Sequence, residues 1–479
     1  MGIPHIPILR RGEEYRSLDV AEVRAHATGE VLAHVSQANA GIVRRDLRRM
    51  TEASDELRQL TVARMIEICK AAGDLFLNAA LPLNEEGDAQ SPDDYVHALS
   101  QTSGLPHTLC KANMRKVFTV FDEMADILRG LTRGMDPAVI DGGTGEHSGI
   151  PVSYGPTTAA LGVVLPSNSP GVNSIWMPSV ALKTPVVLKP GREEPWTPAR
   201  VMAAFIAAGC PRAAFSFYPT DHEGSAAILE HCGRALLFGD EATTKGYANN
   251  AAVQIHGPGR SKVIIGADEI ERWRDHLDVL VASVADNGGR SCINASSIFV
   301  PAHADEVADE LARALAGIEP RAADDPDARL SAFANPKFAE YVDNTIDAGV
   351  SDGGAEDVTA KHRQAPRARQ LDGAEFVSPT VVRCQSVEHP LARTEFLFPF
   401  VSVVEVPNDE LVTALGPSLV VTALTRDEAL LGDLLASAHV DRVNIGPIPT
   451  SRVEWDQPHE GNLFEFLYQR RAIQRVDGW

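Results

Sequence analysis

Residues 161–189, LGVVLPSNSPGVNSIWMPSVALKTPVVLK, decide the fold class of this chain. Two short apolar runs at 161–165 and 185–189 have the length and the β-branched content of buried strands. The segment between them is long enough for a helix that crosses over a sheet and returns the chain parallel to the first strand. The sequence therefore predicts a parallel β-sheet with crossover helices.

The same pattern continues toward the C-terminus. The runs AAFSFY (213–218) and ALLF (235–238) extend this nucleotide-type layer, and Thr197 is expected to cap the crossover helix that leads from the run 185–189 to the run 213–218. After about residue 258 the alternation resumes with the runs KVIIG, SSIFVP, VSVVEV and SLVVTALT and a helix expected over 303–316. This predicts a second α/β domain, in which the polar stretch 351–373 forms an exposed excursion. The first third of the chain is expected to be mainly helical.

Composition narrows the class of protein. The 479 residues include 44 Lys and Arg against 65 Asp and Glu, a net charge of −21, and 44% are hydrophobic. This is typical of a soluble globular protein of two or three domains and disfavours nucleic acid and anionic membranes as partners. Without a run of 18 apolar residues or a signal-peptide pattern, the chain is expected to be cytoplasmic. The six cysteines lack metal-type spacing, so neither a disulfide framework nor a metal site is expected.

One cysteine has the surroundings of a nucleophile. Cys292 lies in ADNGGRSCINASSIFVP (285–301), where two glycines precede it and a strand-like run follows. Glycines let backbone approach a substrate closely, and a peptide N–H at the nucleophile can stabilise an oxyanion. The alternative is a buried, unreactive thiol at a strand end.

Two further candidates follow the first two predicted strands. Asn168, in the turn PSNSPG, can donate its side-chain amide to a developing oxyanion, although it can equally be a turn residue. Lys189 ends the next run, where its ammonium can bind the hydroxyls of a cofactor ribose or simply be solvated. In an open α/β sheet both positions face the ligand crevice.

These motifs, in this order and spacing, resemble those of the aldehyde dehydrogenase superfamily from about residue 150 to 470. PSN resembles the family's oxyanion turn, KPG its ribose-binding lysine segment, and EFLFPF (395–400) the segment whose glutamate holds the nicotinamide ribose. The resemblance implies Cys292 as nucleophile and Asn168 as oxyanion donor. It implies that Lys189, Glu395, Pro166, Ser167 and Gly239 contact NAD or NADP.

The resemblance also implies a domain organisation. A Rossmann-like cofactor domain would comprise residues 1–132 and 156–257, and a catalytic α/β domain residues 258–452. A small oligomerisation arm and tail, residues 133–155 and 453–479, would build a homodimer or homotetramer. The reaction implied is NAD(P)-dependent oxidation of a small-molecule aldehyde through a Cys292 thioester.

Departures from the family pattern bear on which molecule accepts the acyl group from the Cys292 thioester. Hydrolytic members carry a glutamate that activates water, whereas this chain has His256 at about that position, in VQIHGPGRSKVII (253–265). GPGR and HPLARTEFLFP (389–399) resemble segments of the CoA-acylating branch, which implies CoA as co-substrate. His256 is a candidate base or a structural histidine. A hydrolytic enzyme and a catalytically silent nucleotide-binding homologue are the alternatives.

Overall fold

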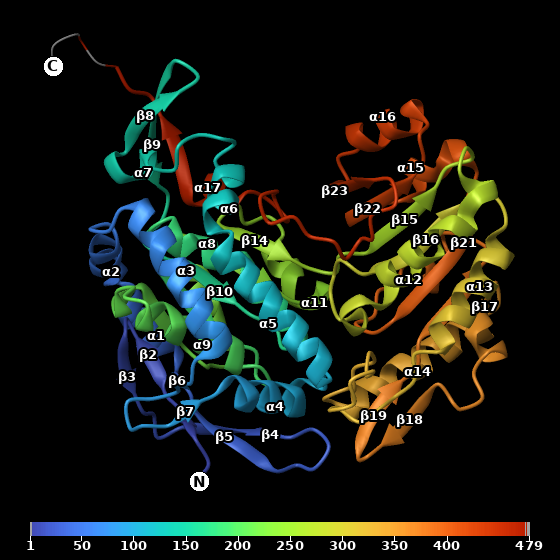
Figure 1. The fold of residues 1–479 in the computed structure, drawn as a ribbon, viewed down its shortest axis with the longest axis horizontal. Coiled ribbons are helices and arrows are strands. Elements are labelled where there is room, and N and C mark those ends of the chain that lie inside the picture. The colour runs from blue at the N-terminus through green and yellow to red at the C-terminus, as the bar shows by residue number, and fades with distance from the viewer. Residues whose placement is uncertain (1, 475, 477–479) are drawn as a thin grey trace.

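The computed structural model describes residues 2–474 and 476, and Figure 1 shows two α/β lobes side by side. The first lobe is built on the sheet β14-β13-β10-β11-β12-β2-β3. Its strands β10 to β14 are parallel, and the N-terminal hairpin β2-β3 adds an antiparallel edge. Their bounds are β10 (Leu161–Val164), β11 (Val186–Lys189), β12 (Phe215–Phe217), β13 (Arg234–Phe238), β14 (Val253–His256), β2 (Ile8–Arg10) and β3 (Glu13–Tyr15). The parallel sheet predicted from residues 161–238 is confirmed.

Helices cover both faces of this sheet because its strands are apolar on both sides. Val186 and Leu188 of β11 face one layer and Val187 faces the other. The first layer contains α3 (Val62–Asn78), α4 (Pro92–Ser103), α5 (His107–Asp122), α8 (Asn173–Ala181) and α9 (Trp196–Ala207). The second contains α1 (Ala40–Leu47) and α10 (His222–His231).

Two predictions for the first lobe need correction. Helix α9 begins at Trp196 rather than after Thr197, and Thr197 donates from its backbone N–H and hydroxyl to the buried Glu194 carboxyl. An acidic side chain three residues upstream therefore caps the first turn. The N-terminal third is also less helical than expected, because residues 5–36 form five strands. Besides β2 and β3 these are β1 (His5–Ile6), β4 (Val20–Arg24) and β5 (Val31–Ser36), which form the sheet β1-β5-β4.

The second lobe repeats the architecture with the sheet β17-β20-β21-β16-β15-β22-β23, parallel except for β17. Helices α12 (Leu277–Ala285) and α13 (Ala304–Ala316) pack on one face, and α14 (Pro336–Ser351) and α16 (Glu428–Ala436) on the other. The strands are β15 (Ser261–Ile265), β16 (Ala295–Val300), β17 (Ala355–Asp357), β20 (Thr380–Cys384), β21 (Phe400–Glu405), β22 (Ser418–Leu424) and β23 (Val440–Ile445). The second α/β layer and the helix over 303–316 are confirmed.

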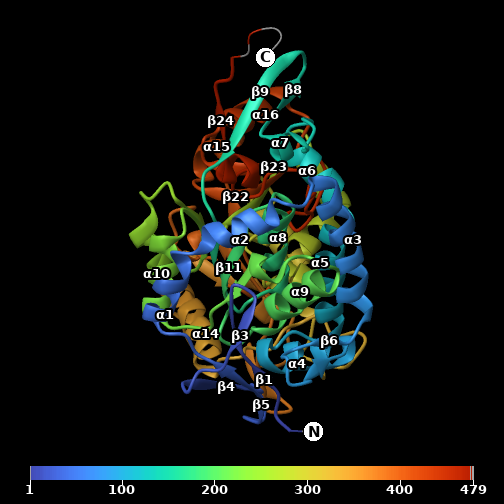
Figure 2. The same ribbon diagram turned by 90° about the vertical axis from the view of Figure 1, so that its left-hand side faces the viewer.

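A small third sheet, β24-β9-β8, projects from the first lobe, and Figure 2 shows it extending beyond the body. It combines β8 (Thr144–His147) and β9 (Ile150–Pro156) with β24 (Tyr468–Arg471). These strands come from the two segments predicted to form the arm and tail. Of that tail, residues 475 and 477–479 lie outside the described residues, as does Met1 of the predicted cofactor domain.

None of the described helices is long and apolar enough to cross a bilayer.

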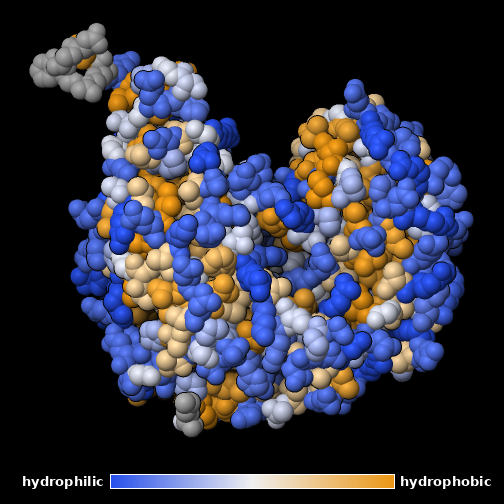
Figure 3. All heavy atoms as spheres, viewed as in Figure 1, coloured by the Kyte–Doolittle hydropathy of each residue, from blue (hydrophilic) through white to orange (hydrophobic). Residues whose placement is uncertain are grey.

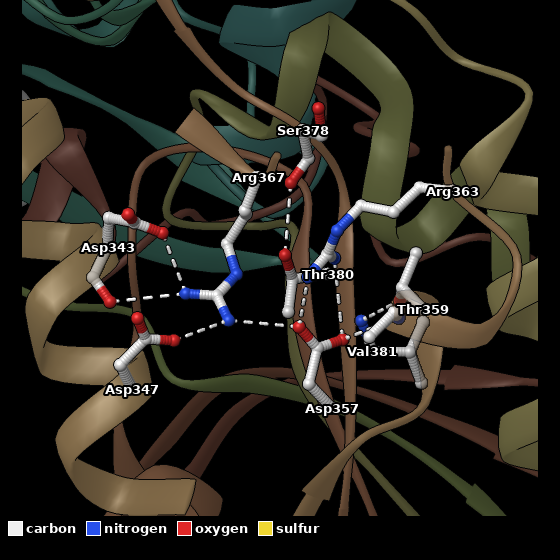
Figure 4. Close-up of polar contacts among 10 residues, drawn as sticks. Asp343, Asp347, Asp357, Thr359, Arg363, Arg367, Ser378, Thr380 and Val381 are labelled. Atoms are coloured by element: carbon white, nitrogen blue, oxygen red, sulfur yellow. Dashed lines mark hydrogen bonds and ion pairs between the residues drawn. The ribbon is translucent and has the colours of Figure 1, made fainter. Parts of the chain in front are cut away.

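The polar stretch 351–373 is more than an exposed excursion. Its Arg367 is 7% exposed and donates to Asp343 at 2.7 Å, Asp347 at 2.8 Å and Asp357 at 2.9 Å, as Figure 4 shows. Asp357 also pairs with Arg363 at 2.6 Å. A cation surrounded by three carboxylates ties this stretch to α14, which helps to explain why a segment with few apolar residues is ordered.

We expect Arg367→Met to destabilise the second lobe by about 1–3 kcal/mol, because it removes the charge-assisted hydrogen bonds of a buried cation and leaves the buried Asp357 carboxylate with Arg363 alone. Urea denaturation measures the change. The matched control is Arg64→Ala, which breaks the exposed Arg64–Glu67 pair and should cost about 0.5 kcal/mol or less. Equal effects of the two substitutions would show that the network contributes no more than a surface ion pair.

Candidate active site

The loop that carries Cys292 lies between α12 and β16 and is held in a strained conformation. Asn287, Gly288 and Gly289 have φ values of 53°, 63° and 68°, in the left-handed region. A Cβ at Gly289 would lie 2.4 Å from the backbone carbon of Phe398, so only glycine fits there. The loop therefore presents Cys292 in a fixed position next to the segment 395–400.

Cys292 differs from the other five cysteines in exposure. It is half-buried, whereas the others are fully buried. Burial raises the pKa of the Cys292 thiol well above its ordinary value, and the carboxylates of Glu460 and Glu395 raise it further. The resting thiol is thus protonated near neutral pH.

The turn with Asn168 meets the cysteine loop, as the sequence motifs predicted. The Asn168 side-chain amide donates to the backbone carbonyl of Arg290 at 2.9 Å, two residues before Cys292. Asn287 adds a second link, because its amide donates to Ser291 at 2.9 Å and to Ser169 at 3.3 Å. The sequence analysis missed Asn287, although its position before two glycines is a signal for a left-handed turn.

The GPGR turn supports the cysteine from the opposite side. A Cβ at Gly259 would lie 2.0 Å from the carbonyl oxygen of Cys292, and the Ser261 hydroxyl donates to that oxygen at 2.9 Å. Glu395 accepts a hydrogen bond from the backbone N–H of Arg260. Burial raises the pKa of Glu395 to about 7, against the lowering effect of the Arg260 and Gly259 N–H groups.

The predicted cofactor residues divide between two places. Lys189 and Arg192 line a cavity of about 490 Å³ that also includes Gly191, Pro219, Thr220, His222 and residues of β4 and β5. Burial lowers the pKa of Lys189, while Glu193 acts to raise it. Among the described contacts no hydrogen bond or ion pair holds the Lys189 ammonium. A partly buried cation in a cavity at the carboxyl edge of the sheet fits the hydroxyls of a nucleotide ribose.

Pro166 and Ser167 connect this cavity to the cysteine loop. A Cβ at Gly191 would lie 2.4 Å from the Ser167 hydroxyl and 2.5 Å from the Pro166 carbonyl oxygen, so the PSN and KPG turns touch. Gly239 follows β13 at the same edge, and its N–H donates to the His256 carbonyl at 3.2 Å. Glu395 lies instead on the side of the GPGR turn, beside Cys292.

His256 has a partner that the sequence analysis did not identify. Its Nδ1 pairs with a carboxylate oxygen of Glu460, and its ring stacks on Phe238 with centroids 4.3 Å apart. Glu460 lies 204 residues away in the chain, in the loop before α17 (Leu463–Leu467).

The site lies where the two lobes meet, and Figure 3 shows the surface hollowed between them. Within residues 2–474 and 476, no cluster of three His, Cys, Asp or Glu side chains has the arrangement of a metal site. The assembled groups are a thiol, an amide donor beside it, two buried carboxylates and a cavity with a free ammonium. Such a set suits covalent catalysis on a carbonyl compound.

Comparison with known proteins agrees with this reading. The model of the aldehyde dehydrogenase family matches residues 14–416. A 2-hydroxymuconic semialdehyde dehydrogenase of Pseudomonas sp. (strain CF600) is 26% identical over 315 residues, 60% of this chain and 61% of that protein. A malonate-semialdehyde dehydrogenase of Listeria monocytogenes is 23% identical over 270 residues, 53% of each chain. The chain thus spans about half to three fifths of the length of these curated relatives.

Solved structures share the whole fold at lower identity. The aldehyde dehydrogenase KauB from Pseudomonas aeruginosa superposes with a TM-score of 0.79 at 18% identity, covering 98% of this chain and 96% of that one. Aldehyde dehydrogenase 21 from Physcomitrella patens gives a TM-score of 0.77 at 17% identity, covering 100% of both chains. With a family model that spans most of its length and this fold, the chain belongs to the aldehyde dehydrogenase family.

Proposed function

We propose that this protein oxidises an aldehyde with NAD⁺ or NADP⁺ through a thioester on Cys292. The observation that carries the proposal is the junction of Cys292 with the Asn168 turn at the carboxyl edge of the first sheet. Solved family structures include complexes with NAD⁺ and with NAP, which supports a nicotinamide cofactor here. The Lys189 cavity would hold its ribose.

The reaction follows from these groups. The Cys292 thiol loses its proton to Glu395, whose raised pKa suits a proton acceptor near neutral pH, and the thiolate attacks the aldehyde carbon. The Asn168 amide and the Cys292 backbone N–H stabilise the resulting oxyanion. A nicotinamide cofactor held by the Lys189 cavity would supply the acceptor for the hydride. The acyl group then remains on sulfur as a thioester.

CoA is the proposed acceptor of that acyl group. The support is His256 at the position of the hydrolytic glutamate, together with the GPGR turn beside Cys292. Transfer of the acyl group to water, which releases a carboxylic acid, is the second candidate, and the buried Glu460 carboxylate near the thiol favours it.

A homodimer or homotetramer built through the sheet β24-β9-β8 is the assembly we propose.

Two cations near Cys292 favour an aldehyde that carries a carboxylate. Burial lowers the pKa of Lys116 and of Arg442, and both side chains interact electrostatically with the Cys292 sulfur. The structure shows no ion pair for either cation in its described part. The names of the curated relatives, which are semialdehyde dehydrogenases, support the same class of substrate.

The activity is tested by following NAD(P)H formation with a panel of aldehydes, with and without a carboxylate, in the presence and absence of CoA. The proposal predicts turnover that requires CoA and forms acyl-CoA. Equal rates without CoA, with free acid as product, would replace the CoA proposal with the hydrolytic one. Absence of NAD(P)H with every aldehyde would favour the silent nucleotide-binding homologue.

Arg192 gives a prediction about cofactor choice. It is exposed at the rim of the Lys189 cavity, where a guanidinium can bind a 2′-phosphate. We expect Arg192→Glu to lower the ratio of kcat/KM for NADP⁺ to that for NAD⁺ by about tenfold, because a carboxylate repels phosphate and accepts the ribose hydroxyl. Steady-state kinetics with both cofactors measures this ratio, and an unchanged ratio would place the 2′-position away from Arg192.

A further inference from the structure

A strained turn brings Glu460 to the active site. Glu460 and Gly461 have φ values of 50° and 112°, in the left-handed region. The Gln254 side chain of β14 donates to the Glu460 carbonyl, and a Cβ at Gly461 would lie 2.9 Å from the Gln254 amide nitrogen. The turn is thus fixed on the strand that ends at His256, and a non-glycine residue is held in a costly conformation there.

The Glu460 side chain is held by His256 alone among the side chains that the structure describes. The carboxylate is 10% exposed and the imidazole 2%, and Nδ1 contacts one carboxylate oxygen. The other imidazole nitrogen, Nε2, is buried without a hydrogen-bond partner in the described chain. His256 therefore orients the carboxylate, while its remaining nitrogen is shielded from bulk solvent.

The surrounding charges keep Glu460 ionised. Burial alone would raise the pKa of Glu460, but His256, and more weakly His459, bring it below its usual value. Burial lowers the pKa of His459 to about 4, so this neighbour is neutral near pH 7. The charge of Glu460 raises the pKa of Asp441 of β23 and of Cys292. His256 lies three residues before Gly259, where a Cβ would lie 2.0 Å from the Cys292 carbonyl oxygen. Glu460 is thus a charged proton acceptor whose field reaches the catalytic sulfur.

We propose that Glu460, oriented by His256, is the general base that deprotonates the acyl acceptor when the Cys292 thioester is cleaved. This inference rests on the proposed function and concerns its second half-reaction only. As the acceptor oxygen or sulfur bonds to the acyl carbon, its proton passes to Glu460 and the carbonyl becomes an oxyanion. The oxyanion collapses, the carbon–sulfur bond breaks, and the Cys292 thiolate leaves. The proton on Glu460 then returns to the thiolate or to solvent.

Pre-steady-state kinetics of Glu460→Gln tests this role. We expect a burst of about one NAD(P)H per active site, because thioester formation does not need Glu460, followed by steady turnover slowed about 10²- to 10⁴-fold. Hydroxylamine attacks a thioester as a neutral amine without a base, so it should restore turnover of Glu460→Gln and yield the hydroxamate. His256→Gln should give the same pattern with a smaller loss, since the carboxylate survives but is misoriented.

The control is Glu454→Gln, which changes an exposed carboxylate in the same loop. It should keep both the burst and the turnover of the wild type. The turnover of Glu460→Gln, measured with and without CoA, identifies the acceptor that Glu460 deprotonates. If turnover falls only in reactions without CoA, Glu460 deprotonates water. If turnover falls in both reactions, Glu460 deprotonates whichever acceptor is present.

Steady turnover of Glu460→Gln within about threefold of the wild type would overturn the inference. A burst lost together with turnover, or turnover that hydroxylamine does not restore, would overturn it as well and make Glu460 a structural residue. A wild type that forms no NAD(P)H with any aldehyde would instead overturn the proposed function itself.

Discussion

Replacing Cys292 with alanine is expected to abolish aldehyde oxidation, with a fall in kcat of at least about 1000-fold. No other described cysteine can replace it, because the remaining five are buried in the cores of the lobes. The variant should keep its fold, since the contacts that hold this loop use the Cys292 backbone rather than its sulfur. NAD(P)H formation measures the activity, and thermal unfolding verifies the fold.

The control for this experiment is Cys384→Ala, which removes a buried thiol on β20 of the second lobe. We expect it to lower the free energy of unfolding by about 1 kcal/mol and to leave kcat largely unchanged. Activity that survives Cys292→Ala but not Cys384→Ala would contradict the assignment of the nucleophile.

Asn168→Ala is expected to lower kcat by about 10²- to 10³-fold with a small change in KM, because an oxyanion donor acts mainly in the transition state. The side chain also ties its turn to the Arg290 carbonyl. Losing that hydrogen bond should cost about 1 kcal/mol of stability. Steady-state kinetics and thermal unfolding separate the two effects.

Asn168→Asp is the matched variant, since it keeps the shape of the side chain and removes the donated proton. It should be at least as impaired as Asn168→Ala, because a negative charge would face the oxyanion. If both variants keep kcat within a few-fold of the wild type, Asn168 is the turn residue that its position between two prolines also allows.

The parallel sheets were predictable because their strands are apolar on both faces and stand out as continuous runs. Val186, Val187 and Leu188 are all fully buried, so no polar position interrupts the apolar run of β11 between these residues. The meeting of Asn168 with the cysteine loop also followed from local sequence, since both residues come next to strand ends and the family motifs mark them.

The Glu460–His256 pair could not be predicted from local sequence. The two residues are 204 positions apart, and a charged residue in a polar loop carries no sign of burial. Only the route of the C-terminal chain across β14 brings them together. The five N-terminal strands were missed for a related reason, because strands such as Glu13–Tyr15 are short and polar and owe their conformation to pairing with neighbours.

Arg367 shows that the composition of a segment does not by itself predict which of its residues are buried. The stretch 351–373 reads as a solvated loop because it contains many charges and few apolar residues. The structure buries Arg367 by giving it three carboxylates, two of them from α14. Burial of a charge depends on partners distant in the sequence, so polarity alone does not place a residue at the surface.

If the reaction runs through Cys292, an acyl group is carried on its sulfur, and mass spectrometry can detect that group. The protein is mixed with an aldehyde substrate and NAD(P)⁺ without CoA, quenched in acid and digested. We expect the mass of the acyl group on the peptide containing Cys292 in the wild type, more of it in Glu460→Gln and none in Cys292→Ala. NAD(P)H formation with no acyl group on that peptide in either Cys292-containing protein would show that the reaction does not pass through a Cys292 thioester.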